Sequence, residues 1–366
     1  MKLGLGLYGN TEYENVDLIE KRKYLKIFDR NHNILDECFQ YSNLKYTWTL
    51  NGLGKCEVDI PLESVKCTQE NFEFRNHIEV WDSLTNNCIW GGQIVDRGFT
   101  EGKLHISCFG YMSLLKWRRL RSKVYSEMTY SNLFIAMIND TNAIENTLVA
   151  VGNLASNTLR TQRTVENKDF LLDKLLSFIE DCNYDIEVDN NRKFNLYTKK
   201  GQSKLQYVLE YGGDADNILI APSLSQSCLD LANSMYAESK SGDTTITSLA
   251  TDTISRDLFG LMEGVSSSKT DITIQSTLDN YCNSDLQKNA YPSNSISLKI
   301  KDSSLAPFDM LEVGDTVSIH LIPYWNFSDK LRILEITHNE DDNTRDIVVG
   351  ETLYRPAKPQ KRKYAK

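Results

Sequence analysis

The sequence predicts a mainly β protein with two related β domains and a small α+β domain between them. Two stretches share one three-strand pattern, helical spacing begins only after the first of them, and 366 residues exceed what a single core usually organises. The expected divisions are an N-terminal arm at 1–22, a first β domain at 23–109, an α+β insertion at 110–204, a second β domain at 205–354 with a helical segment near 274–289, and a basic tail at 355–366.

The shared pattern occupies 76–110 and 314–351 and is the most informative feature of the chain. Each copy reads as a short strand, a polar turn, a longer strand, a turn and a third strand, with apolar residues alternating as half-buried strands require. The matched apolar positions are Val80 with Ile319, Ile94 with Ile336, and Ile106 with Val348. Side-chain identity between the copies is low, so either a duplication or two unrelated antiparallel meanders would give this pattern.

The first β domain is expected to begin with a strand at 24–29 and a turn at 30–33. A second strand at 45–50 places Tyr46, Trp48 and Leu50 on one face. Alternation resumes at 56–62, where Pro61 should end the pairing because proline lacks the N–H that a ladder needs.

The period changes from strand to helix at Gly110. We expect a short helix from Tyr111 with a cationic face, a second helix capped by Ser131 and running to Ile138, and a third capped by Asn167 and running to Asp181. The cationic face comprises Lys116, Arg118, Arg119, Arg121 and Lys123. A hairpin at 184–197 with its turn at 189–191 closes the insertion.

The second β domain is expected to open with a strand at 206–211 and then two strands that meet at a tight turn near Pro222. Gly260 and Gly264 mark further turns. The later apolar positions at helical spacing are Ile274, Leu278, Tyr281, Cys282 and Leu286. Strict alternation at 295–300 predicts a strand that introduces the second copy of the meander.

Composition excludes several classes of protein. The chain has 41 Lys and Arg against 50 Asp and Glu, a formal charge of −9 that argues against non-specific binding of nucleic acid through the bulk surface. The exception is the tail, where Lys358, Lys361, Arg362 and Lys363 would bind phosphate or an acidic partner, or remain simply solvated. The eight cysteines lack ligand-like spacing, which predicts reduced thiols and no zinc site. No stretch resembles a secretory signal or a membrane span, so we expect a soluble protein without classical export.

The chain carries no recognisable catalytic constellation. Its five histidines, His32, His77, His105, His320 and His338, lie apart without helical metal-site spacing. Glu340, Asp341 and Asp342 would gather a cation or form a polar hairpin turn. Trp81, Trp90, Trp117 and Tyr111 would stack on sugars, or contribute to the core or to a subunit contact. We therefore expect no cofactor, no metal and no enzyme activity, although a pair of carboxylates from distant strands would still suit a glycosidase.

The second meander resembles the closing barrel of phage tail hub proteins. Pro307-Phe308, then Val313-Gly314-Asp315 before a strand, then LRILEITHNEDDNTRDIVVGE carry the resemblance. GKCEVDIPL, NHIEVWD, IWGGQIVDRGF and the start of a helix at Leu114-Leu115 are similar to the opening barrel of the same family. TDTISRDLFGLMEG is similar to another of its segments, with Phe259 where tyrosine is common. The resemblance covers roughly 24–354.

The resemblance implies two tube-type β-barrel domains in a baseplate or tail-tip hub of the virion, assembled in the host cytoplasm. It implies a homotrimer whose six barrels form a pseudo-hexameric ring between the tail tube, or a distal tail protein, and a tip, spike or receptor-binding protein. Phage DNA or the tape-measure protein would occupy the lumen, for which an acidic protein is suited. Because the chain ends soon after the second barrel, we expect no lytic module there.

Two alternatives to the hub remain open: a carbohydrate-binding, adhesin-like tail-tip protein, and a tail-associated cell-wall hydrolase. For the hub, the candidate oligomer-interface residues are Trp81, Trp90, Ile94, Leu331 and Ile333. The candidate partner-binding residues are the basic side chains of the tail, from Lys358 to Lys363.

Overall fold

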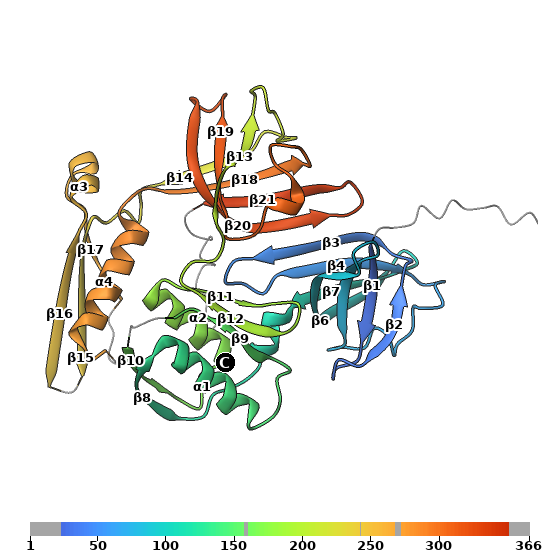
Figure 1. Ribbon diagram of the computed structural model, residues 1–366, viewed down its shortest axis with the longest axis horizontal. Helices are drawn as coiled ribbons and strands as arrows, with labels where there is room; N and C mark the ends of the chain where they lie inside the picture. The colour runs from blue at the N-terminus through green and yellow to red at the C-terminus, as the bar shows by residue number, and fades with distance from the viewer. Residues whose placement is uncertain (1–22, 157–159, 242, 268–271, 351–366) are drawn as a thin grey trace, which may run out of the picture.

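The computed structural model describes residues 23–156, 160–241, 243–267 and 272–350. Strands dominate this part of the chain, and the predicted mainly β class with an α+β insertion is confirmed (Figure 1). Four hydrophobic cores organise it: one in each of two β units, one in the insertion, and one in a small side unit. The predicted N-terminal arm and basic tail, with Lys358, Lys361, Arg362 and Lys363, lie outside the described residues.

The first β unit consists of seven strands whose inward residues fill one core. The strands are β1 (Lys23–Phe28), β2 (Ile34–Cys38), β3 (Ser42–Thr49), β4 (Lys55–Pro61), β5 (His77–Asp82), β6 (Asn87–Thr100) and β7 (Lys103–Gly110). Along β4, Cys56, Val58 and Ile60 are buried while the residues between them are not, which is the predicted alternation. Pro61 is the last residue of β4, as expected from its missing N–H.

The second β unit forms from the later part of the chain around its own core. Its strands are β13 (Ser203–Tyr211), β14 (Ser223–Ser227), β18 (Ser293–Lys301), β19 (Thr316–Leu321), β20 (Phe327–Asn339) and β21 (Thr344–Gly350), and the short 3-10 helix η2 (Phe308–Met310) precedes β19. The strand predicted at 295–300 is the centre of β18. β13 pairs with β19 in parallel, whereas the other pairs of this unit are antiparallel.

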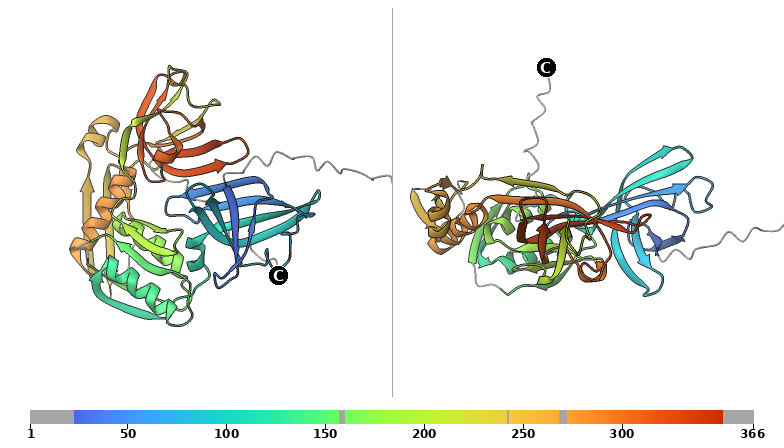
Figure 2. Two further views of the ribbon diagram at one scale, coloured as in Figure 1. Left: turned by 45° about the vertical axis from the view of Figure 1, so that its right-hand side comes forward. Right: turned by 90° about the horizontal axis from the view of Figure 1, so that it is seen from above.

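The two β units are not two closed barrels, because one 13-stranded sheet runs through both. Its order is β14-β18-β21-β20-β3-β4-β7-β6-β5-β1-β2, with β19 and β13 branching from β20. β20 is long enough to pair with β19 along its first half and with β3 along its second half. Figure 2, left, shows the red second unit lying above the blue first unit at this junction.

The insertion packs two helices against small sheets. Its elements are the 3-10 helix η1 (Tyr111–Leu115), β8 (Lys123–Thr129), α1 (Tyr130–Asn142), β9 (Ala150–Leu154), β10 (Arg160–Val165), α2 (Leu171–Cys182), β11 (Asp185–Val188) and β12 (Lys193–Tyr197). The hairpin of β11 and β12 was predicted, whereas β8, β9 and β10 were missed.

The predicted helix caps in the insertion are wrong. Thr129 caps α1 through its side chain, and Ser131 instead donates a hydrogen bond from Oγ to the carbonyl oxygen of Ala155. Helix α2 begins after Phe170, and the Asn167 Oδ1 atom accepts a hydrogen bond from the Ser122 N–H. Each polar side chain therefore bonds to a distant segment rather than to its own helix.

A side unit interrupts the second β unit. The predicted division at 205–354 did not include a separate unit of this kind. It contains β15 (Ser234–Ser241), β16 (Thr244–Thr251), α3 (Thr253–Phe259), β17 (Glu263–Val265) and α4 (Gln275–Asn289). Helix α4 carries the predicted stripe, and Leu278, Cys282 and Leu286 are buried against the strands. Of the two strands expected to meet at a turn near Pro222, the one after it forms as β14, whereas residues 216–221 before it form no strand and Ile218 makes a single bridge to Ile300.

Candidate functional site

The two meanders, β5-β6-β7 and β19-β20-β21, have the same strand register, except that the β5-β6 pairing shifts once more between Val80 and Trp81 and the β19-β20 pairing does not. In the first, His77 lies opposite Gln93, and Ile106 opposite Arg97. In the second, Thr316 lies opposite Arg332, and Ile347 opposite Ile336. His77 therefore corresponds to Thr316, Gln93 to Arg332 and Arg97 to Ile336.

A bulge lies at the corresponding place in both long strands. The register shifts between Ile94 and Asp96 in β6, and between Ile333 and Glu335 in β20. Just before it, the Ile94 N–H donates to the Asn76 carbonyl at 2.9 Å, as the Ile333 N–H donates to the Asp315 carbonyl at 2.7 Å.

The shared bulge corrects two of the residue matches expected from sequence. Ile94 corresponds to Ile333 rather than Ile336, and Ile106 corresponds to Ile347 rather than Val348. The match of Val80 with Ile319 holds, since both lie three residues after the paired starts of β5 and β19. Alternation alone does not locate a bulge, so the sequence comparison slipped along the strands that follow it.

Four of the five predicted interface residues lie inside the β units. Trp90, Ile94, Leu331 and Ile333 are at most 2% exposed, so they fill the cores of their own units and cannot meet another subunit. Trp81 is half-buried: its Nε1 donates to Glu79 Oε2 at 2.8 Å, and the Lys26 ammonium lies 3.7 Å from its ring centre. A subunit contact at Trp81 stays a prediction.

The pairing of β3 with β20 connects the two β units within the chain. The paired residues run from Thr49 opposite Glu335 to Lys45 opposite Asn339. The hydroxyl oxygens of Thr47 and Thr337 lie 2.8 Å apart, and the Thr49 hydroxyl donates to Glu335 Oε2 at 3.0 Å. We call this pairing of β3 with the second half of β20 the internal joint.

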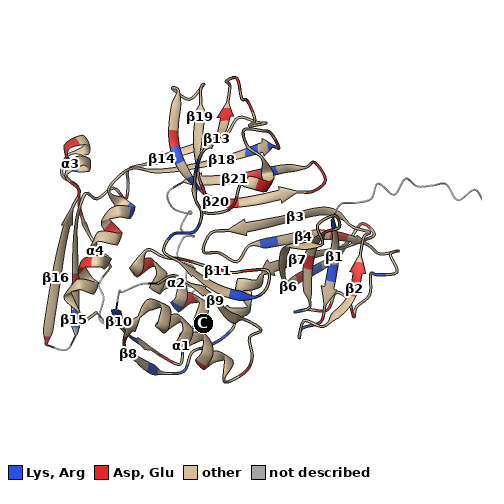
Figure 3. Ribbon diagram, in the orientation of Figure 1, with Lys and Arg blue, Asp and Glu red and all other residues tan. Residues whose placement is uncertain are grey.

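One face of the sheet is polar on both sides of the internal joint, and the other face is apolar. The apolar face carries residues that belong to the two cores, including Tyr46, Val58, Leu298 and Ile336. The polar face carries Lys45, Thr47, Thr49, Lys55, Glu57, Asp59, Ser297, Lys299, Glu335 and Thr337. Its charges include ion pairs, Lys55 with Glu57 and Lys299 with Asp342, and Figure 3 shows acidic and basic residues interspersed along both units.

Asp185 at the start of β11 fixes the insertion to both β units. Its Oδ1 atom accepts from Asn51 Nδ2 at 2.9 Å, and its Oδ2 atom accepts from Arg332 Nη2 at 2.6 Å. The same guanidinium donates to the carbonyl oxygens of Lys200 and Gly314. The Lys200 N–H also donates to Asp185 Oδ2 at 2.7 Å, and Asp185 is 5% exposed, so this charge is held by hydrogen bonds from three residues rather than by water.

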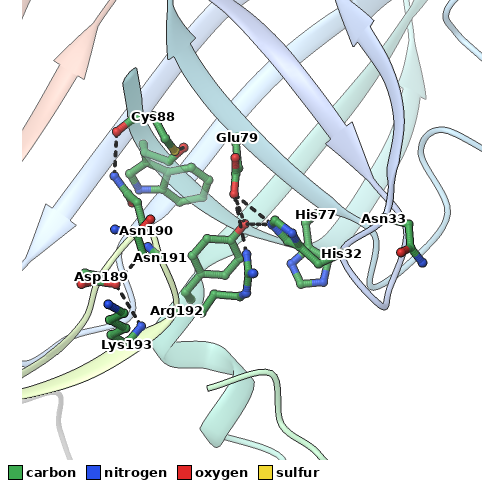
Figure 4. A network of polar contacts seen from close by, with 12 residues as sticks. His32, Asn33, His77, Glu79, Cys88, Asp189, Asn190, Asn191, Arg192 and Lys193 are labelled. Atoms are coloured by element: carbon green, nitrogen blue, oxygen red, sulfur yellow. Dashed lines mark hydrogen bonds and ion pairs between the residues drawn. The ribbon is translucent and has the colours of Figure 1, made fainter. Parts of the chain in front are cut away.

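A second polar network joins the first β unit to the insertion around Glu79 (Figure 4). Glu79 Oε1 accepts from the Tyr111 hydroxyl at 2.7 Å and lies 3.0 Å from His32 Nε2, while Arg192 approaches to 4.0 Å. Burial alone would raise the pKa of Glu79, but the hydrogen bonds from His32, Tyr111 and Trp81 outweigh it and the pKa is lowered. Glu79 is therefore an ionised anchor.

His77, beside this network, is held neutral. Burial, followed by the nearby charge of His32, lowers the pKa of His77 to about 4. Across the insertion hairpin, Asn190 Nδ2 donates to the carbonyl oxygens of Cys88 and Ile89. His32 contacts Glu79 and Tyr111, and His77 Nε2 lies 3.4 Å from the Arg30 carbonyl oxygen, so both histidines have structural roles.

The carboxylates of the turn after β20 each have protein partners. Glu340 forms an ion pair with Lys23 and lies 3.1 Å from His338 Nε2, and Asp341 accepts from the Asn43 N–H at 3.0 Å. Asp342 accepts from the Thr344 hydroxyl at 2.6 Å and from Lys299 Nζ at 3.0 Å. Among the described residues, no cluster of His, Cys, Asp and Glu could hold a metal ion.

The four aromatic residues considered for sugar binding do not form one exposed platform. Trp90 and Tyr111 are each 2% exposed, and Trp81 contacts Lys26. Trp117 is 43% exposed and borders a cleft of about 960 Å³ that also involves the predicted cationic residues Arg118, Arg119 and Arg121. The cationic run thus lines a cleft after the buried turn η1 rather than a helix face.

No family model and no curated protein matches the chain, but its fold matches solved tail proteins. Prophage tail protein gp18 from Listeria monocytogenes EGD-e has a TM-score of 0.64 at 12% identity, covering 90% of this chain and 94% of that one. The 43 kDa tail protein of prophage MuSo2 from Shewanella oneidensis has a TM-score of 0.63 at 11% identity, covering 90% and 97%. A tail protein from Neisseria meningitidis MC58 has a TM-score of 0.62 at 9% identity, covering 90% and 96%.

The chain has the fold of these phage tail proteins. The resemblance predicted from the sequence is therefore confirmed at the level of the fold. No helix in the described ranges is both long and apolar enough to cross a bilayer. The internal joint, Asp185 and Arg332 were missed from the sequence, because Asn51 and Asp185, Asp185 and Arg332, and Thr47 and Thr337 are 134, 147 and 290 residues apart.

Proposed function

We propose that the protein is a structural component of a phage tail, a baseplate or tail-tip hub without enzymatic activity. Three copies would form a ring in which two equivalent β units per copy give six similar positions around a channel. The observation that carries this proposal is the register that the two meanders share around a common bulge, in a chain with a tail-protein fold. Two units with the same meander in one chain suit a ring with half as many copies as positions.

The polar face of the sheet is the surface that this ring would turn toward its channel. Because the opposite face fills the two cores, the polar face is the one left to meet water or cargo. Its hydroxyl groups and paired charges would hold phage DNA or a tape-measure protein only weakly, since phosphate binding grows with the number of unpaired cations. In this proposal the ring is part of the virion tail, assembled in the host cytoplasm, between the tail tube or a distal tail protein and a tip or receptor-binding protein.

Mass photometry and negative-stain images of the purified full chain test the hub. The expected particle has three times the mass of one chain, threefold symmetry and a central hole. A particle that stays monomeric and binds cell-wall polysaccharide would contradict the hub and favour an adhesin. Release of fragments from purified peptidoglycan, lost when one carboxylate is replaced, would contradict the absence of enzyme activity.

A further inference from the structure

Among the edges of the described 13-stranded sheet that lack a partner strand, two correspond to the two strands of the internal joint. Among the described strands, β14 pairs with β18 alone. The second half of β6, from Val95 to Thr100, pairs with β7 on one side and with no described strand on the other. Unpaired edges of this kind are templates for pairing with another chain.

The β14 edge corresponds to β3 residue by residue. β4 pairs with β7, the third strand of the first meander, and β18 pairs with β21, the third strand of the second. The first pairing begins with Lys55 opposite Phe109, and the second with Ser295 opposite Gly350. The next strands of the sheet are β3, which pairs with β4, and β14, which pairs with β18. In these pairings Thr47 lies opposite Lys55, and Ser225 lies opposite Ser295. β14 therefore occupies in the second unit the position that residues 45–49 of β3 occupy in the first.

The open half of β6 corresponds to the half of β20 that β3 covers. The shared bulge places Asp96 with Glu335, Gly98 with Thr337 and Phe99 with His338. In β20 these positions are covered, and His338 is 4% exposed. In β6 they are open, and Phe99 is 70% exposed.

We propose that β14 of one copy of this chain adds to the second half of β6 of another copy, in the register of the internal joint. The register pairs Ser227 with Asp96, Gln226 with Arg97, Ser225 with Gly98, Leu224 with Phe99, and Ser223 with Thr100. This head-to-tail contact repeats around a ring, and each copy supplies one β14 edge and one β6 edge. The inference rests on the proposed ring for its second copy, but it specifies which strands meet and how.

The side chains in this register fit one another. Ser227 beside Asp96 repeats the hydroxyl–carboxylate pair that Thr49 and Glu335 form in the internal joint. Leu224 and Phe99 are both apolar, and in this register they occupy the positions of Tyr46 and His338, whose rings lie 5.1 Å apart in the internal joint. The pairing places no like charges opposite one another and covers the exposed Phe99 ring.

A cysteine pair tests the register directly. Adding a Cβ at Gly98 meets no atom within 4 Å, so Gly98→Cys is accommodated in the isolated chain. With the exposed Cys228 changed to Ser, Gly98→Cys combined with Ser225→Cys is expected to give covalent dimers and trimers under mild oxidation. Mixing the two single variants is expected to give a covalent dimer and no larger species, which shows that the link joins two chains.

The matched control moves one cysteine by a single residue. Gly98→Cys with Gln226→Cys places the second thiol on the opposite face of the strand, because side chains alternate along it, and roughly tenfold less crosslink is expected. Equal crosslinking by both pairs would overturn the proposed register.

A proline tests the backbone contact. In β3 the Leu50 N–H donates to Leu334 and the Leu44 carbonyl accepts from Glu340, so even-numbered residues there face β20. The corresponding outward residues of β14 are Leu224 and Gln226. Gln226→Pro removes an outward N–H and leaves those that face β18, so the monomer should fold while association weakens by roughly tenfold or more. Gln226→Ala keeps the N–H and should assemble as the wild type does.

Particle mass separates this inference from the proposed function. A three-copy particle without the 98–225 crosslink overturns the strand pairing and leaves the hub intact. A specific crosslink in a ladder that extends beyond three copies supports the pairing and contradicts closure at three. A monomer without crosslink at every concentration overturns both.

Discussion

The meander β5-β6-β7 and the meander β19-β20-β21 have the same register and bulge, yet they differ in what covers the end of the long strand. In β20 this end contacts β3, and Leu334, Ile336 and His338 are at most 4% exposed. In β6 the corresponding end pairs on one side only, and it is largely exposed. The difference teaches that two long strands with the same bulge are buried to different extents, because the neighbouring strand sets the burial.

The largest expected difference in stability between the meanders concerns the residue two positions before β5 and β19, which has a positive φ in both. Arg75 has a φ of 71° and Gly314 a φ of 100°, and a Cβ at Gly314 would lie 2.7 Å from the Lys200 carbonyl oxygen. Gly314→Ala should therefore lower the free energy of unfolding by about 3 kcal/mol or more, through backbone strain and the clash. Chemical denaturation measures this loss.

Arg75→Gly is the matched control, because it places the residue of the second meander in the first. It relieves the left-handed strain but loses the contact of the Arg75 guanidinium with the Trp117 ring, so a change under about 1 kcal/mol is expected. Equal losses from the two substitutions would show that the Lys200 contact does not decide the need for glycine.

At the start of the first meander His77 is an acid-sensitive group, whereas Thr316 at the corresponding position does not titrate; burial also lowers the pKa of His338 in β20, which is present in wild type and control alike. The unfolded chain binds a proton at His77 near pH 6.5, but burial and the neighbouring His32 lower the folded pKa to about 4. Between these values the unfolded state binds more protons, so stability should fall by about 3 kcal/mol as the pH drops from 6.5 to 4. Urea unfolding across this range measures the slope.

The control for this slope is His77→Thr, which removes the titrating group and keeps the residue type of the second meander. The variant starts less stable because a buried ring is lost, yet its stability should change less with pH. His32, Glu79 and Arg192 still act on the site, and the pKa of Glu79 is already lowered, so its own loss begins only below about 4.5. Parallel slopes for both proteins would contradict a neutral His77.

The third comparison concerns the corresponding residues Arg332 and Gln93, and it has the smallest expected effect on the free energy of unfolding. Both side chains donate to the carbonyl oxygen of the positive-φ residue, Gly314 or Arg75, but only Arg332 also reaches Asp185. Arg332→Gln should keep the first contact and lose the ion pair, at a cost of about 2 kcal/mol, since Asn51 and the Lys200 N–H still hydrogen-bond with Asp185.

A double-mutant cycle with Asp185→Asn isolates the ion pair by thermal unfolding. The two substitutions together should cost less than the sum of their separate effects, because each removes the same interaction. Additive losses would mean that Arg332 acts through Gly314 and Lys200 alone.

Much of the fold could be predicted because its signals are local. Alternation located most strands of the β units, and apolar residues at helical spacing located α2 and α4. The caps failed because Ser131 and Asn167 find partners in other segments. Four interface candidates failed because an apolar strand residue looks alike in sequence whether it faces its own core or another chain.

The sequence by itself determined the mainly β class, the insertion after Gly110 and the presence of two meanders, because residue periodicity encodes which face of a strand or helix is apolar. Only the tertiary structure decided that β3 joins β20 into one sheet and that Asp185 fixes three parts of the chain together. Those contacts join residues more than a hundred positions apart through backbone and polar groups, whose partners no local pattern specifies.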